Sequence, residues 1–167
     1  LDLGCEWKGI DFSMFWQGVA KRDLWLDGPM FWGISGGEWQ STGLKEHLDY
    51  YRPENTTSVF GPNTNAYFPK MYMSKDMNQK VQTRYLQNGA YARLKNIQLG
   101  YTFPTQIINK LHMQKLRVYV SAENVLTITS LPSGFDPETT YSSYSDGNSG
   151  KTYPLQTTIS FGLNATF

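Results

Sequence analysis

The feature that most constrains this chain is the alternation of its last residues, from Leu155 to Phe167. Apolar residues such as Ile159 fall on one face of this run, and polar residues such as Asn164 fall on the other. A period of two is typical of a β-strand, because successive side chains point to opposite faces. At ~3.3 Å per residue the run extends for roughly 40 Å, whereas strands of soluble proteins usually end after about five or six residues. The length favours a strand that crosses a bilayer, even when it is tilted.

A second run, from Lys115 to Thr129, also has two faces of different chemistry. One face is mostly apolar, whereas the other carries polar or charged residues, among them Lys115, Arg117, Ser121 and Glu123. A charged face inside a long strand is typical of a wall between lipid and a water-filled lumen. We therefore expect these four residues to line a lumen. The apolar residues expected to face lipid in the two strands are Val118, Val120, Ile159, Phe161 and Leu163.

Three further strands are predicted upstream, at Leu1–Gly9, Asp11–Ala20 and Ala90–Phe103. The third changes phase, because its apolar positions are even-numbered at first and odd-numbered later. A β-bulge near Lys95–Asn96 explains such a change, since one extra residue shifts the alternation. The sequence thus predicts an all-β fold with about five antiparallel strands.

The connections between these strands alternate in length. A tight turn at Gly9–Asp11 is followed by the long link Lys21–Gly89, the short Pro104–Gln114 and the long Ser130–Pro154. In outer-membrane barrels, short periplasmic turns alternate with longer extracellular loops. This pattern predicts that the C-terminus lies on the periplasmic side and that both long links lie outside the cell. Within the first long link, a short helix is predicted at Gly43–Tyr51.

Composition narrows the classes of function. Aromatic residues make up 15% of the chain although its mean hydropathy is only −0.47. This combination suits a barrel, whose strands turn only every second residue toward lipid. The net charge of +1 gives no reason to expect nucleic acid as a partner. Cys5 is the only cysteine, which excludes an internal disulfide. A soluble β-rich carbohydrate-binding module, with loop aromatics as its sugar platform, fits the same composition and stays open as the alternative.

Four runs of residues stand out as an ordered set. These are Ala92–Pro104 (ARLKNIQLGYTFP), Leu116–Thr127 (LRVYVSAENVLT), Gly134–Glu138 (GFDPE) and the terminal strand after Tyr153–Pro154. Together they resemble the RLKN, LRVYVSGxNLFT, DPE and FGLNxxF segments of SusC/RagA-type TonB-dependent transporters. The second run departs from that pattern at Ala122, where the family has glycine. Weaker likenesses upstream are WKGIDFS, FWQGV and YRPEN.

The resemblance implies that residues 1–167 are the C-terminal part of one TonB-dependent receptor β-barrel domain, with the N-terminal plug and the earlier strands absent. It implies a 22-stranded transmembrane β-barrel with long extracellular loops, a multi-pass protein of the cell outer membrane in Bacteroidetes-type bacteria. Such transporters import oligosaccharides or peptides, driven by TonB, and pair with a SusD-like surface lipoprotein. Membrane lipid and the barrel-assembly machinery are the other expected partners. Phe167, with Phe161 in the same strand, resembles the terminal aromatic signal that this machinery reads.

The candidate contacts with substrate or with the lipoprotein lie in the two long links. Aromatic residues are numerous there for solvated loops, so they either contact a ligand or pack the loop against itself. The acidic pair in GFDPE either sets a turn through its Asp-Pro step or faces a ligand. The candidate contact residues are Trp25, Trp32, Trp39, Tyr50, Tyr51, Asp136 and Glu138.

We find no constellation of residues that indicates catalysis, a metal or a cofactor. His47 and His112 stand alone, without Cys or carboxylates at ligand spacing, and we expect both to be solvated surface residues. Asp146–Gly150 begins like a calcium-binding EF-hand loop, but Thr157 stands where the bidentate glutamate belongs. The sequence therefore indicates a protein that is not an enzyme, and an outer-membrane barrel enzyme is disfavoured because no active site is present.

Overall fold

The computed structural model of the chain describes residues 1–33, 43–72, 77–140 and 152–167. The chain forms two compact units. The sheet unit comprises Leu1–Arg22, Ala90–Ser130 and Leu155–Phe167, and the loop unit comprises Asp23–Gly89 and Leu131–Pro154. Each unit is described by itself.

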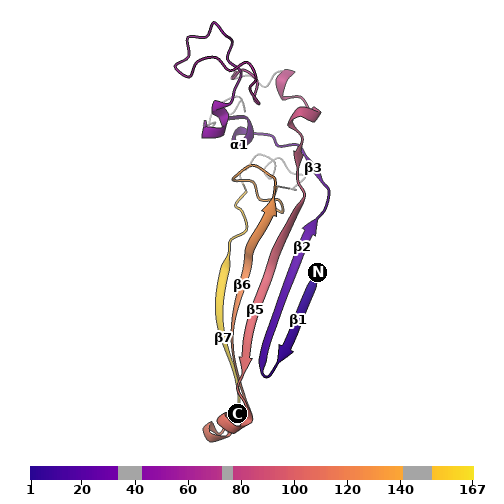
Figure 1. Cartoon of the computed structure of the whole chain (residues 1–167), viewed down its shortest axis with the longest axis vertical. Coiled ribbons are helices and arrows are strands. Elements are labelled where there is room, and N and C mark those ends of the chain that lie inside the picture. The colour runs from indigo at the N-terminus through magenta and orange to yellow at the C-terminus, as the bar shows by residue number, and fades with distance from the viewer. Residues whose placement is uncertain (34–42, 73–76, 141–151) are drawn as a thin grey trace. The chain divides into compact units, whose positions relative to one another are not determined.

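Five long strands form the sheet unit (Figure 1). Each strand pairs antiparallel with its neighbour, in the order β1-β2-β5-β6-β7. Their bounds are β1 Asp2–Trp7, β2 Ile10–Val19, β5 Tyr91–Thr102, β6 Lys115–Thr129 and β7 Thr158–Thr166. The predicted class and number of strands are confirmed, and β6 has the bounds that its alternation predicted.

The hairpin between β1 and β2 turns one residue earlier than predicted. Its two central residues are Lys8 and Gly9, both with positive φ, at 50° and 85°. Ile10 already belongs to β2 and pairs with Trp7. Two successive residues with positive φ form the tight turn whose twist matches that of the flanking strands, and this favours a turn at Lys8–Gly9 over one at Gly9–Asp11.

The predicted bulge in β5 is present at Lys95. Leu94 and Asn96 have Cα partners in β2 and in β6, and the register of both ladders skips Lys95. The register of β2 continues from Phe15 to Trp16 across this point, so β5 carries one extra residue there. Because of that extra residue, the alternation of β5 changes phase while both of its faces are kept.

The alternation predicted that the last strand begins at Leu155, but β7 begins at Thr158. The ladder between β6 and β7 ends at the pair of Glu123 with Thr158. The next residue of β6, Asn124, has a φ of 53°, which turns its backbone out of the ladder. Its side-chain amide donates to the Gln156 carbonyl at 3.1 Å, and its carbonyl accepts from the Thr157 hydroxyl at 2.9 Å. These side-chain bonds replace the regular backbone pairing.

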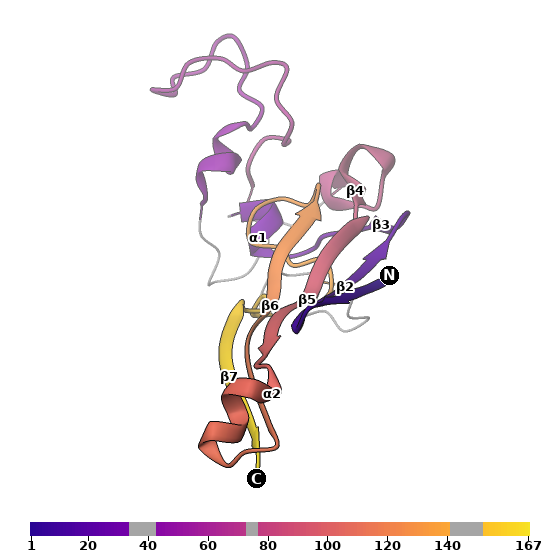
Figure 2. The same cartoon turned by 60° about the horizontal axis from the view of Figure 1, so that its bottom comes forward.

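The connection from β5 to β6 contains α2 Thr105–Ile108 and η5 Asn109–Leu111. Pro104 precedes α2, where its missing N–H interrupts no ladder. Both views place α2 near the C-terminus of the chain (Figure 1, Figure 2), and the Gln114 N–H donates to the Thr166 carbonyl at 2.8 Å. The short link that the sequence predicted at Pro104–Gln114 is confirmed, and the structure shows that it is helical. No helix in the described ranges is long and apolar enough to cross a membrane.

The loop unit contains short elements around an aromatic core. They are the paired strands β3 Asp23–Leu24 and β4 Gln87–Asn88, and the helical turns α1 Pro29–Trp32, η2 Lys45–Leu48, η3 Met77–Gln79 and η4 Thr83–Tyr85. The predicted short helix at Gly43–Tyr51 is therefore confirmed as η2. The buried core residues are Leu24, Leu26, Phe31, Trp32, Phe68, Tyr85, Leu131 and Phe135. With so little regular structure, packing of this core holds the unit together.

Candidate functional site

The register of the sheet separates apolar from polar side chains. Three rows of paired residues lie on one face, which we call the apolar face. They are Leu3, Met14, Ile97, Ala122 and Ile159; Cys5, Phe12, Leu99, Val120 and Phe161; and Trp7, Ile10, Tyr101, Val118 and Leu163. The face therefore contains all five residues predicted to contact lipid, together with residues of β1, β2 and β5, and no row includes a charge.

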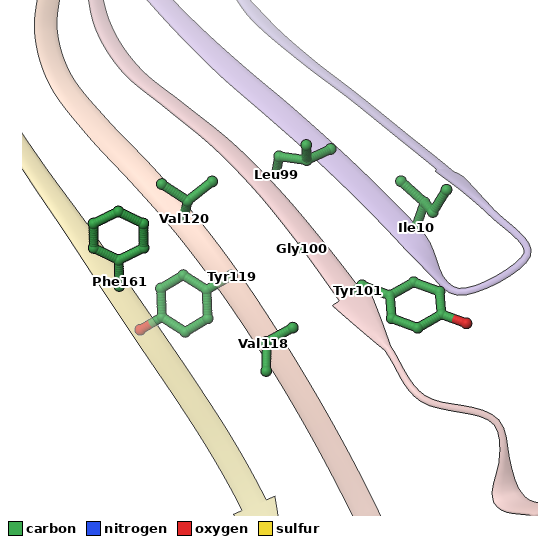
Figure 3. A pocket seen from close by; sticks show the side chains of 8 residues that line it. All are labelled: Ile10, Leu99, Gly100, Tyr101, Val118, Tyr119, Val120 and Phe161. Atoms are coloured by element: carbon green, nitrogen blue, oxygen red, sulfur yellow. The ribbon is translucent and has the colours of Figure 1, made fainter. Parts of the chain in front are cut away.

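Side chains of the apolar face are largely uncovered. Phe161 is 85% exposed, and Ile159 and Leu163 are each 64% exposed. Figure 3 shows Val120 between Phe161 and Leu99, with Val118, Ile10 and Tyr101 farther along the strands. Soluble proteins rarely leave so large a continuous apolar surface open, because exposing it to water costs free energy in proportion to its area.

The opposite face, which we call the polar face, consists of the alternate residues of the same strands. Its rows are Glu6, Asp11, Gly100, Tyr119 and Gly162; Gly4, Ser13, Gln98, Ser121 and Ser160; and Asp2, Phe15, Asn96, Glu123 and Thr158. Arg117 and Lys115 follow on the same side of β6, paired with Asn164 and Thr166. The structure thus brings the four residues predicted to line a lumen onto one face.

An ion pair crosses three strands on the polar face. Arg117 in β6 donates from Nε to Asp11 Oδ1 in β2 at 2.9 Å, and its Nη2 contacts the other carboxylate oxygen. The pair passes over Gly100 in β5, where a Cβ would lie 2.5 Å from the guanidinium and from both carboxylate oxygens. A larger residue at position 100 would therefore displace the Arg117 or the Asp11 side chain from the ion pair. Sequence reasoning missed Asp11 and Gly100, because their cooperation depends on strand register.

A second close contact on this face joins Tyr119 and Gly162, which are paired across β6 and β7. A Cβ on Gly162 would lie 2.1 Å from the tyrosine ring. The ring therefore occupies the space that a side chain at position 162 needs. The Arg117 guanidinium lies 4.8 Å from the centre of the same ring. The Tyr119 ring, Gly162 and the ion pair of Asp11 with Arg117 are thus packed closely together on the polar face.

We predict that Gly162→Val lowers the stability of the assembled protein by about 1–3 kcal/mol, because the valine and the Tyr119 ring compete for one space. The measurement is the temperature at which the full-length protein stops migrating as the folded species on a gel and migrates as the unfolded one. Gly4→Val is the matched control, since a Cβ at Gly4 meets only the Phe12 carbonyl, at 3.6 Å. Equal melting temperatures for the two variants would refute the close packing at Gly162.

The structure corrects the expectation that Trp32 is a contact residue. It is 1% exposed, and its indole N–H donates to the Leu26 carbonyl at 3.2 Å. Its ring packs edge-on against Tyr85, with centroids 4.9 Å apart. Trp32 is therefore occupied by the core of the loop unit and is inaccessible to a ligand. Trp25 is half-buried and packs against the same core.

The expectation of a solvated His47 is wrong as well. His47 is 5% exposed; its Nε2 lies 3.1 Å from the Phe31 carbonyl, and its Nδ1 accepts from the Leu44 N–H at 2.9 Å. A Cβ at Gly33 would meet the imidazole at 2.8 Å. The histidine thus joins the segment around Phe31 to the η2 turn. His112, by contrast, is exposed as predicted.

Asp136 is buried and acts within its own turn. It is 6% exposed, and its Oδ1 accepts from the Glu138 N–H at 2.8 Å. This geometry supports the turn-forming interpretation of GFDPE and removes Asp136 from the accessible contact residues. Among the other candidates, Glu138 and Tyr50 are half-buried and Tyr51 is 41% exposed. Trp39 and Asp146–Gly150 lie outside the described residues.

A cavity of about 560 Å³ opens in the loop unit. Its walls combine the aromatic rings of Phe31, Tyr67 and Phe68 with the carboxylates of Glu46 and Asp49. Aromatic walls with a few polar groups are typical of sites for small organic ligands. Within the part of the chain that the structure describes, no group of three or more His, Cys, Asp or Glu could hold a metal ion.

The sequence was compared with those of known proteins. No family model matches the chain. TonB-dependent receptor P3 of Formosa agariphila is 35% identical to it over 97% of the chain and 15% of that receptor. The chain belongs to the TonB-dependent receptors. TonB-dependent receptor P26 of the same organism is 25% identical over 97% of the chain and 16% of its own length. The chain thus spans only 15–16% of these receptors.

A solved structure shows the same receptor fold. The RagAB peptide importer in its open-open state matches 99% of the chain and 16% of the importer chain, with a TM-score of 0.65 and 25% sequence identity. The SusC/RagA-like resemblance of the sequence is therefore confirmed. The antiparallel five-stranded sheet is consistent with a piece of a TonB-dependent receptor barrel, and the similar proteins are outer-membrane receptors and transporters and not enzymes.

Proposed function

We propose that this chain forms part of the wall and the outer loops of a barrel that imports oligosaccharides or peptides across the outer membrane, driven by TonB. The observation that carries the proposal is the sheet with an apolar face and a polar face in a chain of this receptor family. A wall between lipid and a water-filled lumen needs this arrangement, since every strand must satisfy both environments. The import needs no covalent chemistry from these residues.

In this proposal the apolar face contacts lipid, and Lys115, Arg117, Ser121 and Glu123 face the lumen. The chain supplies the last five of 22 strands, so barrel closure requires strands outside residues 1–167. Two open edges, one on β1 and one on β7, support this requirement, because an unpaired edge inside a membrane leaves backbone groups unsatisfied. The C-terminus lies on the periplasmic side, and the residues of the loop unit lie outside the cell.

Neighbouring residues of β7 provide a direct test in the full-length receptor. In a Cys5→Ser background, we expect Ser160→Cys to react with a small charged maleimide in intact outer membranes. Ile159→Cys should react only after the membrane is dissolved and the protein unfolded, because lipid excludes the charged reagent. Labelling of Ile159→Cys at the rate of Ser160→Cys in intact membranes would disprove the assignment of the faces.

The substrate and the lipoprotein are proposed to meet the loop unit. The cavity next to Phe31 and Tyr67 offers rings and carboxylates to a ligand, and the exposed Tyr51 lies in the same unit. Pairing of RagA with a partner in the RagAB peptide importer supports a SusD-like surface lipoprotein here, and it supports peptides as one of the two substrate classes. Trp25, Tyr50 and Glu138, all half-buried, remain candidate contacts in this unit.

Phe167 is proposed to be the signal that the barrel-assembly machinery reads, together with Phe161 in β7. Phe167 is 76% exposed and directly follows the strand. Deleting it in the full-length receptor should lower the amount of folded protein in the outer membrane several-fold, whereas Phe167→Tyr should assemble normally. Quantitative blotting of outer-membrane fractions measures both, and an unchanged amount after deletion would refute the role.

A further inference from the structure

The apolar face contains a shallow hollow of about 490 Å³. Its floor consists of the short side chains of Leu99, Val118 and Val120, and taller groups bound it, with Phe161 at one side and Tyr101 at the other (Figure 3). The hollow exists because β-branched valines of β6 lie between aromatic residues of β5 and β7 on the same face.

Water is a poor occupant of this hollow. No charged residue lines it, and the strands beneath it are paired continuously, so their backbone N–H and C=O groups already bond to each other. A water molecule needs two or more polar partners to be held in place. An extended hydrocarbon chain, in contrast, has no polar groups that need partners in such a site, and it gains close packing there.

A cation lies next to the hollow at the β1–β2 turn. The Lys8 Nζ lies 4.7 Å from the centre of the Trp7 ring, and Trp7 belongs to the row of the apolar face that continues through Ile10 and Tyr101. Among the described residues, Lys8 contacts no carboxylate. The carboxylates near this turn, those of Glu6 and Asp11, belong to the polar face. Lys8 therefore presents a positive charge on the apolar side.

We propose that the hollow binds one acyl chain of an anionic phospholipid, and that Lys8 binds the phosphate of the same molecule. Trp7 and Tyr101, each with an apolar body and a polar tip, suit the boundary between chain and headgroup. The inference rests on the proposed lipid exposure of the apolar face. It goes further, because bulk lipid would cover every row of this face equally, whereas a bound molecule requires the hollow and the charge together.

The experiment uses the full-length receptor, freed of lipid in detergent and titrated with dioleoylphosphatidylglycerol, with bound molecules counted by native mass spectrometry. Val120→Trp fills the floor of the hollow, and Ile159→Trp adds the same ring to the same face outside it. Lys8→Gln removes the proposed phosphate contact, and Lys110→Gln, at an exposed position in η5, is its control. Val120→Phe replaces Val120→Trp if the larger residue prevents assembly.

We expect the receptor to bind one phospholipid that Val120→Trp loses and Ile159→Trp keeps. Lys8→Gln should weaken this binding about fivefold, the effect of one cation near an anionic headgroup, and Lys110→Gln should leave it unchanged. Equal numbers of bound phospholipids in Val120→Trp and Ile159→Trp would overturn the inference. A Val120→Trp variant that keeps its phospholipid but changes the oligomeric state of the receptor would overturn it too. Shielding of Ile159→Cys from maleimide is measured separately, so a missing lipid site and a wrongly assigned face give different results.

Discussion

Phe161→Arg should reduce the stability of the assembled receptor by about 2–4 kcal/mol, the cost of an arginine on the lipid-facing surface of a barrel near the bilayer centre. Phe161 stands in the middle row of the apolar face and is 85% exposed, so the arginine has no protein cavity in which to hide. The effect arises almost entirely from the membrane, since the same substitution at an 85% exposed position of a soluble protein is close to neutral.

The next residue of the chain supplies the control. Ser160 lies beside Phe161 in β7 but on the polar face, paired with Ser121. Ser160→Arg should change the melting temperature of the full-length receptor by a small fraction of the change in Phe161→Arg, when both are reconstituted in the same lipid vesicles. A larger loss in Ser160→Arg than in Phe161→Arg would reverse the assignment of the faces.

Trp32→Ala should destabilise the loop unit by about 3–5 kcal/mol, the usual cost of removing a buried aromatic side chain. The indole packs against several rings of the core at once, among them Phe31, Phe68 and Tyr85. Its removal leaves a cavity and also frees the Leu26 carbonyl, which now accepts the indole N–H. The unit is built from short elements, so few other contacts can replace this packing.

Limited proteolysis of the receptor in intact membranes measures the effect. Opening of the loop unit should make cleavage within it about a hundredfold faster in Trp32→Ala, while the strands of the sheet unit stay protected. Tyr51→Ala is the control, because Tyr51 is 41% exposed and should leave cleavage unchanged. If Trp32→Ala instead keeps its protection and loses only substrate binding, the indole is a contact residue and the core assignment is wrong.

The strands of this protein could be predicted because alternation is a local property. In β6, each residue from Lys115 to Thr129 carries information about its own face, and the predicted bounds agree with the structure. The bulge at Lys95 was equally visible, since an extra residue leaves a change of phase in the sequence. Periodicity alone could not locate the start of β7, because that depends on Asn124, a residue of another strand, and on its positive φ.

The loop unit could not be predicted in the same way. Whether an aromatic residue contacts a ligand or another ring depends on partners distant in sequence, and Trp32 packs against Tyr85 across most of the first long link. The burial of His47 has the same origin, because its imidazole lies against the Phe31 carbonyl, sixteen residues away in the chain. On the sheet, the ion pair of Asp11 with Arg117 also required knowledge of strand register. The face on which each residue of a strand lies could be predicted from the sequence, whereas contacts between residues distant in sequence could not.

The bulge at Lys95 in β5 has a consequence for how this barrel wall tolerates changes in length. Deleting almost any residue inside a strand exchanges the lipid and water sides for everything beyond the deletion. Lys95 is different, since Leu94 and Asn96 already occupy opposite faces and already pair with consecutive residues of β2, Trp16 and Phe15. Loss of Lys95 would leave every neighbour on its present side. Position 95 is thus a point at which one residue can be lost while the register with β2 and the two faces of the wall are kept.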